Sequence, residues 1–161
     1  MSPNPEILAR LPHRPPFLFV DEITGHGENA IHTAVTFPPD WPVFSGHYPG
    51  HPVVPGAILC EAIFQSGALL IGELAAAGLP DLAANLPANQ SPGQPSGLPS
   101  NLPVVARIFT AKFKRQVLPG EQLEIEVKLS ERLASAWLMK GIIRVAGKVA
   151  AQVEFSCALT S

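Results

Sequence analysis

The stretch SGHYPGHPVVPGAILCEAIFQ, residues 45–65, decides the fold of this chain. Four prolines and three glycines fall within residues 42–56. Proline fixes φ and lacks a backbone donor, while glycine admits positive φ. We therefore expect residues 42–56 to form a rigid, shaped loop without regular structure. The loop ends at Pro55, and proline suits the first position of a helix.

The residues after Pro55 predict a single long helix from Gly56 to about Ala77, because the run is almost entirely apolar and is ended by Gly78-Leu79-Pro80. Some twenty residues make a helix ~30 Å long. Since it is apolar on nearly all sides, this helix should be buried in a protein core. A membrane span of similar length is disfavoured by three residues that would be costly in lipid: Glu61, Gln65 and Glu73.

His47 and Glu61 are the candidate proton-transfer groups. His47 lies on the rigid loop, and Glu61 follows about one turn into the apolar helix. Alone, a histidine on such a loop is more often a surface residue, and a lone helix glutamate commonly reaches solvent. Their combination is rarer and favours acid–base chemistry on a lipid-like substrate. The unpaired N–H groups at the helix start, near Gly56, could polarise a carbonyl.

Alternating apolar and polar residues predict antiparallel strands on both sides of the helix. After the helix, residues 123–130 and 151–159 alternate clearly. The other expected strands are Phe17–Ile23, Ala30–Phe37, Val104–Lys114 and 136–146. A tight connection at Ala146-Gly147-Lys148 joins the strand at 136–146 to the strand at 151–159.

One buried helix and about six antiparallel strands predict an α+β fold in which a single curved sheet wraps around the helix. Such a sheet has exposed edges, so pairing between two copies of the chain is expected.

The composition fits one domain spanning residues 1–161, with 47% hydrophobic and 15% charged residues. A net charge of −2 argues against general nucleic-acid binding. The polar, proline-rich start shows no secretory segment, so a cytoplasmic location is expected. Cys60, beside Glu61 in the helix, is interpreted as a small inert core residue.

Residues 79–103 do not fit a compact domain, because they carry six prolines, two glycines and a single charged residue, Asp81. Loops of this length are either functional covers or mobile inserts. We interpret this segment as an insert loop.

Four motifs resemble the 3-hydroxyacyl-[acyl carrier protein] dehydratases of bacterial fatty-acid synthesis, the FabZ type, which have the hotdog fold. The motifs, in the order of that family, are LPHRPPFLFVD (11–21), GHYPGHPVVPG (46–56), EAIFQ (61–65) and FKRQVLPGE (113–121). The resemblance covers most of the chain outside residues 79–103.

The resemblance implies that His47 is the catalytic base and Glu61 the catalytic acid, contributed by opposite subunits of a homodimer. A trimer of such dimers is the larger assembly it allows. A glutamate at position 61 is similar to the FabZ type, whereas related dehydratase/isomerases carry aspartate. By the same resemblance, Gly56 binds the thioester carbonyl through its N–H, with Val54 and Pro55 beside it, and Gln65 orients the carboxylate.

The implied reaction dehydrates a 3-hydroxyacyl thioester to a trans-2-enoyl thioester without a metal or redox cofactor. His47 removes a C2 proton and Glu61 protonates the departing C3 hydroxyl. The implied partner is an acyl carrier protein bearing the 3-hydroxyacyl chain, with no role for nucleic acid or membrane. That carrier is acidic, and the dense basic cluster expected to dock it is Lys112, Lys114 and Arg115, although these residues could equally form a solvated strand face.

Three other functions remain open at this point. A hotdog acyl-CoA thioesterase shares the fold and the acyl-thioester substrate, although the loop around His47 and the spacing to Glu61 favour dehydration. An enoyl-CoA hydratase would run the same chemistry backward on another carrier. A non-catalytic subunit of a heteromer is disfavoured because both His47 and Glu61 are present.

Overall fold

The computed structural model describes residues 4–77, 103–133 and 136–159. Helices and strands follow one another along the chain in this order: α1 (Pro5–Arg10), β1 (Glu22–Gly27), β2 (Ala30–Thr36), α2 (Val43–Gly46), α3 (Gly56–Ala76), β3 (Pro103–Phe113), β4 (Gln122–Leu133), β5 (Ala136–Val145) and β6 (Lys148–Leu159). The strands form one six-stranded sheet in the order β1-β2-β4-β5-β6-β3, and every neighbouring pair is antiparallel.

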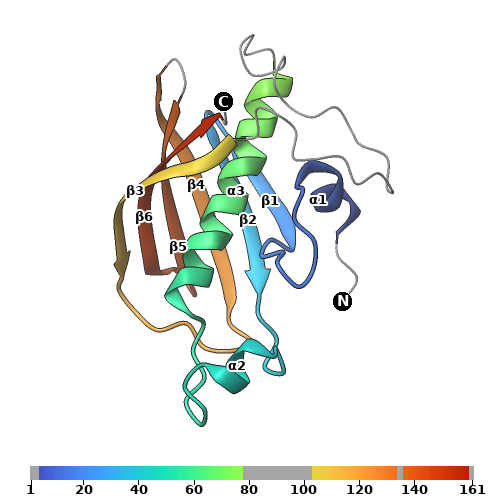
Figure 1. Cartoon of the computed structure of the whole chain (residues 1–161), viewed down its shortest axis with the longest axis vertical. Helices are drawn as coiled ribbons and strands as arrows, with labels where there is room; N and C mark the ends of the chain where they lie inside the picture. Colours follow the sequence, from blue (N-terminus) through green and yellow to red (C-terminus); the bar gives the residue numbers. More distant parts are fainter. Residues whose placement is uncertain (1–3, 78–102, 134–135, 160–161) are drawn as a thin grey trace.

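The sheet curves around α3, which crosses its concave face, while β3 bends over one side of the helix and α1 lies on the other (Figure 1). The predicted α+β architecture and the predicted long helix are confirmed. By length and composition α3 could cross a membrane, but it packs on the sheet and buries much of its surface in the core. Residues 79–102 of the predicted insert lie outside the described residues.

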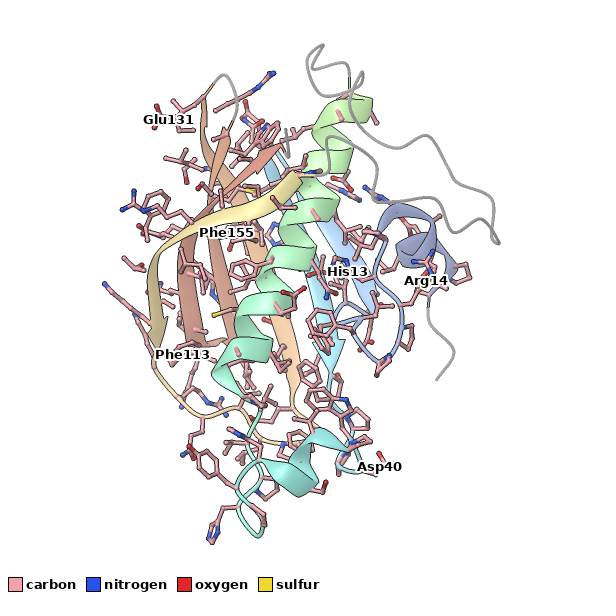
Figure 2. All side chains as sticks on the ribbon, viewed as in Figure 1. His13, Arg14, Asp40, Phe113, Glu131 and Phe155 are labelled. Carbon is pink, nitrogen blue, oxygen red and sulfur yellow. The ribbon has the colours of Figure 1, made fainter. Side chains whose placement is uncertain are left out.

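Two glycines let α3 approach the sheet closely. A Cβ on Gly141 of β5 would lie against Ile63 Cγ2, far inside van der Waals contact. A Cβ on Gly67 of α3 would lie 3.1 Å from the Phe155 ring. Phe155 is fully buried and lies behind the middle of α3 (Figure 2). The helix is therefore held in fixed register on β5 and β6 by close packing.

The strand expected at Phe17–Ile23 begins only at Glu22. At Phe17 and Phe19 the backbone is bonded to a helix side chain: Gln65 accepts the N–H of Phe19 at 2.8 Å and donates to the carbonyl of Phe17 at 3.2 Å. The first backbone bond to β2 comes at Asp21, whose N–H donates to the carbonyl of Ala34 at 2.9 Å. The other strands agree with the sequence to within a few residues. Ala146 and Gly147 both take positive φ, as a two-residue hairpin turn between β5 and β6 requires.

Two short helices were not predicted. Residues 42–56 were expected to lack regular structure, but Val43–Gly46 form the one-turn helix α2 after Pro42. Proline tolerates this place because the first N–H groups of a helix have no partner within it. Near the N-terminus, α1 begins at Pro5, and the Asn4 side chain accepts the N–H of Glu6 as its cap.

Candidate active site

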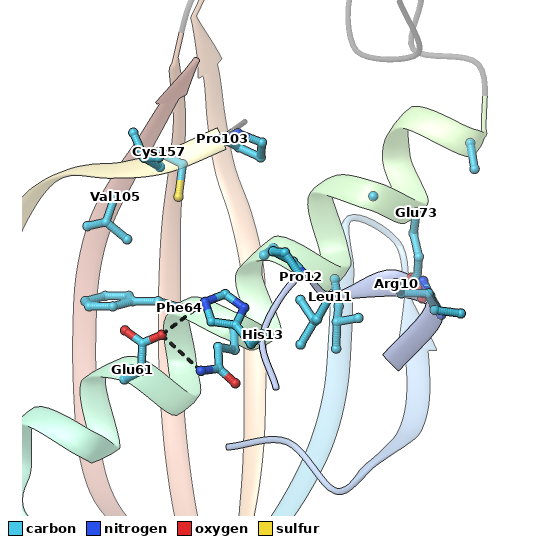
Figure 3. A pocket seen from close by; sticks show the side chains of 17 residues that line it. Arg10, Leu11, Pro12, His13, Glu61, Phe64, Glu73, Pro103, Val105 and Cys157 are labelled. Atoms are coloured by element: carbon cyan, nitrogen blue, oxygen red, sulfur yellow. Dashed lines mark hydrogen bonds and ion pairs between the residues drawn. The ribbon is translucent and has the colours of Figure 1, made fainter. Parts of the chain in front are cut away.

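A cavity of about 900 Å³ runs along one face of α3. The helix residues that line it recur every three or four positions, from Glu61 at one end to Ala76 at the other, so they share one side of the helix. The opposite wall combines Ala9–His13 with the start of β3 and Cys157 (Figure 3). Between the polar residues, the cavity surface on α3 is formed by Phe64, Ala68, Leu69 and Gly72. The cavity can therefore hold a long apolar chain, and the carboxyl group of Glu61 lies at one end of it.

Glu61 and Gln65 lie together, because residues four apart share one helix face. Gln65 Nε2 donates to Glu61 Oε1 at 3.0 Å. The Gln65 amide is itself fixed, because its Oε1 accepts the Phe19 N–H. That bond decides which end of the amide points at Glu61. Gln65 is almost fully buried, whereas the Glu61 side chain is 23% exposed and opens toward the cavity.

His13 is a site residue whose position the sequence did not predict. Its Nε2 lies 3.6 Å from Glu61 Oε1, and its ring reaches the carboxylate from the segment between α1 and β1 (Figure 3). Burial lowers the pKa of His13 below its ordinary 6.5, Glu61 opposes that shift, and Arg14 adds to it. The signal in the sequence was the motif at residues 11–21, but nothing in its spacing indicates which helix residue it meets.

The far end of the cavity is polar. Arg10 and Glu73 both line it, and their side chains form an ion pair at 2.5 Å. Glu73 also contacts His26 Nδ1 at 3.0 Å through its other oxygen. Twelve residues separate Glu61 from Glu73 along the helix, which is ~18 Å at the usual rise. Glu73, predicted only as a polar helix position, thus marks the end of the apolar path.

His47 is not brought to Glu61 within one chain. It follows α2, its N–H donates to the carbonyl of Val43 at 3.0 Å, and its ring lies against Tyr48 with centroids 4.4 Å apart. The residues that line the cavity beside Glu61 do not include His47. Within the described residues, His47 and Glu61 therefore do not line the same cavity.

The start of α3 lies beneath an aromatic ring. A Cβ on Gly56 would lie 3.0 Å from the Phe113 ring, at the end of β3. Pro55 precedes the helix as its N-cap residue. Val54 is buried, and its N–H donates to the carbonyl of Val117 at 2.8 Å, so that donor is already used. The Gly56 N–H belongs to the first turn, where helix geometry provides no partner.

The three predicted basic residues differ in their surroundings. Lys112 and Lys114 are exposed at the end of β3, on either side of Phe113. The guanidinium of Arg115 forms an ion pair with Glu121 at 2.6 Å, which neutralises its charge. The exposed charge beside the start of α3 is thus carried by the two lysines.

The described residues contain no cluster of three or more histidine, cysteine or acidic side chains that could hold a metal ion. Both cysteines are buried, and burial raises the pKa of the Cys157 thiol to about 12. Cys60 shows a raised pKa as well, from burial and from its neighbour Glu61. Neither cysteine has the lowered thiol pKa of a nucleophile. What this arrangement can do is bind an apolar chain and exchange a proton at Glu61.

Comparison with known proteins shows which family the chain is similar to. A family model described as a FabA-like domain matches residues 11–89. The 3-hydroxyacyl-[acyl-carrier-protein] dehydratase FabZ of Anaeromyxobacter sp. (strain K) is 34% identical over 152 residues, which cover 92% of this chain and 85% of that protein. The FabZ protein of Dechloromonas aromatica (strain RCB) is 34% identical over 155 residues, covering 95% and 94%.

Solved structures share the fold. The dehydratase heterocomplex ApeI:P from Xenorhabdus doucetiae matches with a TM-score of 0.71 at 17% identity, covering 96% of this chain and 91% of that one. The Escherichia coli PaaI protein from the phenylacetic acid degradation operon matches with a TM-score of 0.58 at 14% identity, covering 85% and 81%. At these identities the likeness concerns the fold alone, and it agrees with the expected hotdog arrangement.

Proposed function

Because the chain belongs to the FabZ family of 3-hydroxyacyl-[acyl-carrier-protein] dehydratases, we propose that it dehydrates 3-hydroxyacyl thioesters on acyl carrier protein to trans-2-enoyl thioesters. The observation that carries the proposal is Glu61, a carboxyl group fixed by Gln65 at the head of a long apolar cavity. The product feeds fatty-acid or related lipid synthesis. A cytoplasmic location is part of the same proposal.

In the proposed mechanism the acyl chain lies along α3 in the cavity, with its C3 hydroxyl at Glu61. His47 takes a proton from C2, and electrons from that C–H bond form the C2–C3 double bond. The C3–O bond breaks as Glu61 donates its proton, and water leaves. His47 then holds one extra proton and Glu61 lacks one, and exchange with solvent restores both. Each proton-transfer group contributes ~10²–10⁴-fold to the rate.

The thioester carbonyl is assigned to the start of α3. The Gly56 N–H and the positive end of the helix dipole would stabilise the negative charge that develops on the carbonyl oxygen when C2 loses its proton. Gly56 lies under the Phe113 ring, which shields this point from water on one side. Pro55 and Val54 fix the position of the helix start.

A homodimer completes the site in this proposal. Among the strands that the structure describes, β3 lies at an edge of the sheet and pairs only with β6. Its exposed side chains include several large apolar ones: Val104, Val105, Ile108, Phe109 and Phe113. An exposed apolar edge of this length favours pairing with a second copy. Pairing there would bring the partner's loop toward this chain's cavity, so that His47 of one chain could meet Glu61 of the other.

Docking of the acidic carrier is assigned to the exposed pair Lys112 and Lys114, with Arg115 as a weaker contributor because Glu121 neutralises it. These residues flank Phe113, next to the proposed thioester position. The phosphopantetheine arm would arrive with the substrate.

The test is the loss of enoyl absorbance when the purified protein meets trans-2-enoyl thioesters on carrier protein and on coenzyme A. We expect hydration by the wild type, and loss of it in His47→Ala and Glu61→Gln. Release of free thiol with an intact double bond would contradict the proposed dehydratase activity and indicate a thioesterase. The double variant Lys112→Glu/Lys114→Glu should raise KM for the carrier substrate only, and Lys128→Glu, an exposed lysine on β4, is its control.

A further inference from the structure

Two side-chain nitrogens converge on the same oxygen of Glu61. Gln65 Nε2 lies 3.0 Å from Oε1, and His13 Nε2 lies 3.6 Å from that same atom. In the part of the chain that the structure describes, no hydrogen bond or ion pair reaches Oε2. The two oxygens of this carboxyl group are therefore chemically distinct before any substrate binds.

The environment of His13 decides which of its nitrogens carries the proton. Its Nδ1 is buried and has no hydrogen-bond partner among the described residues. A neutral imidazole has one N–H, and a buried N–H without an acceptor costs its full desolvation free energy. The tautomer protonated at Nε2 avoids that cost and directs the N–H at Glu61 Oε1. At 3.6 Å the contact is electrostatic, and catalytic bonds of this kind tighten when substrate binds.

The position of His13 is set by its neighbours. The Arg14 guanidinium donates to the carbonyls of Leu11 and His13, both at 2.7 Å, and so fixes the backbone on either side. The imidazole stacks on Phe17, with ring centroids 6.3 Å apart. Phe17 in turn is bonded through its carbonyl to Gln65. His13 and Gln65 are thus held in one network around Glu61.

We infer that His13 is a positioning residue which, together with Gln65, keeps Glu61 Oε1 as a hydrogen-bond acceptor and so confines the acid proton to Oε2. This inference rests on the proposed function, because it assigns the proton that Glu61 would deliver to the C3 hydroxyl. If the proton could sit on either oxygen, the carboxyl group would present its unprotonated oxygen to the substrate part of the time. The charged groups that face His13 are Glu61, which favours its protonation, and Arg14, which opposes it.

Matched amide substitutions test the inference. Glutamine at position 13 places its amide near the place of Nε2, whereas asparagine places the same amide near Nδ1, where the described residues offer no partner. We expect His13→Asn and His13→Leu to lose about 10²-fold in kcat, the size expected when a reacting group is misplaced by about 1 Å. KM should change little. His13→Gln should recover most of kcat.

Equal losses in the Asn and Gln variants would overturn the inference and leave His13 a structural residue. Thermal unfolding shows whether each variant is folded. If the Leu variant is unfolded, the comparison of the Asn and Gln variants still tests the role of His13.

A second measurement does not depend on activity. In the wild type the carboxylate of Glu61 raises the pKa of His13 against the effect of burial, so Glu61→Gln should lower that pKa in an NMR titration of the imidazole. An unchanged titration would overturn the contact itself. Failure of the wild type to hydrate any enoyl thioester would instead overturn the proposed function, while the titration would still test the contact between His13 and Glu61.

Discussion

The ring of Phe113 covers Gly56, so that strand β3 and the start of α3 share one point of contact: a Cβ at position 56 would lie 3.0 Å from the ring. The nearest atoms belong to a half-exposed side chain that can move by a few tenths of an ångström. The contact therefore tolerates a methyl group better than a branched side chain.

The first prediction concerns this contact. Gly56→Val should lower kcat by about 10²-fold, because the branched side chain pushes the helix start and its N–H away from the thioester carbonyl. Gly56→Ala should cost much less. Adding Phe113→Ala to Gly56→Val should recover part of the loss, measured against Phe113→Ala alone by the same hydration assay. Purely additive losses in this double-mutant cycle would refute the steric explanation.

A mixture of two inactive variants tests the two-chain site. If His47 and Glu61 come from different chains, a dimer of one His47→Ala chain and one Glu61→Gln chain contains one intact site. Random reassembly should then restore about a quarter of wild-type activity, because half of the dimers are mixed and each has one working site. Each variant alone is the control. A mixture that stays inactive would place both residues of a working site in one chain.

Gly72 should govern the length of acyl chain that the cavity accepts. It lines the cavity, and a Cβ there meets no atom within 4 Å. Gly72→Phe should fill the space between Glu61 and the Arg10–Glu73 pair. Hydration of a long-chain enoyl thioester should fall much more than hydration of crotonyl thioester. Equal losses on both substrates would show that the acyl chain does not run along α3.

Two glycine-to-alanine changes should shift stability in opposite directions. Gly141→Ala places a methyl group against Ile63 and should lower the free energy of unfolding by about 1–3 kcal/mol, as overpacking does. Gly72→Ala adds a methyl group at a helix position where the space around the new Cβ is open. This change should raise the free energy of unfolding by up to about 1 kcal/mol. Urea unfolding measures both, and a stable Gly141→Ala protein would mean that α3 can move off β5.

His13 should make the protein less stable in mild acid. Burial lowers the pKa of His13 in the folded chain below 6.5. As the pH falls below 6.5, His13 therefore binds a proton more readily in the unfolded chain than in the folded chain. The stability present above pH 6.5 is then lost as the pH falls through the folded pKa. His13→Gln should show a smaller loss of the free energy of unfolding between pH 7.5 and pH 5.5. Identical losses in variant and wild type would exclude the effect of burial.

Sequence alone determined the elements whose signals are local. The helix from Gly56 was predicted at its first residue, because a proline–glycine loop and an uninterrupted apolar run specify that boundary. Alternation predicted five of the six strands to within a few residues, and with them the single sheet around one helix. The resemblance assigned Gln65 to Glu61, and helix geometry brings the two together, since residues four apart share one face.

Only the tertiary structure decided the contacts between distant segments. His13 meets Glu61 across 48 residues of sequence, and Arg10 pairs with Glu73 across 63. The expected strand at Phe17 was lost because a buried helix side chain, Gln65, took its backbone hydrogen bonds. Local preference predicts which segments form helices and strands. Packing and the need to satisfy buried polar groups decide which residues from separate segments meet.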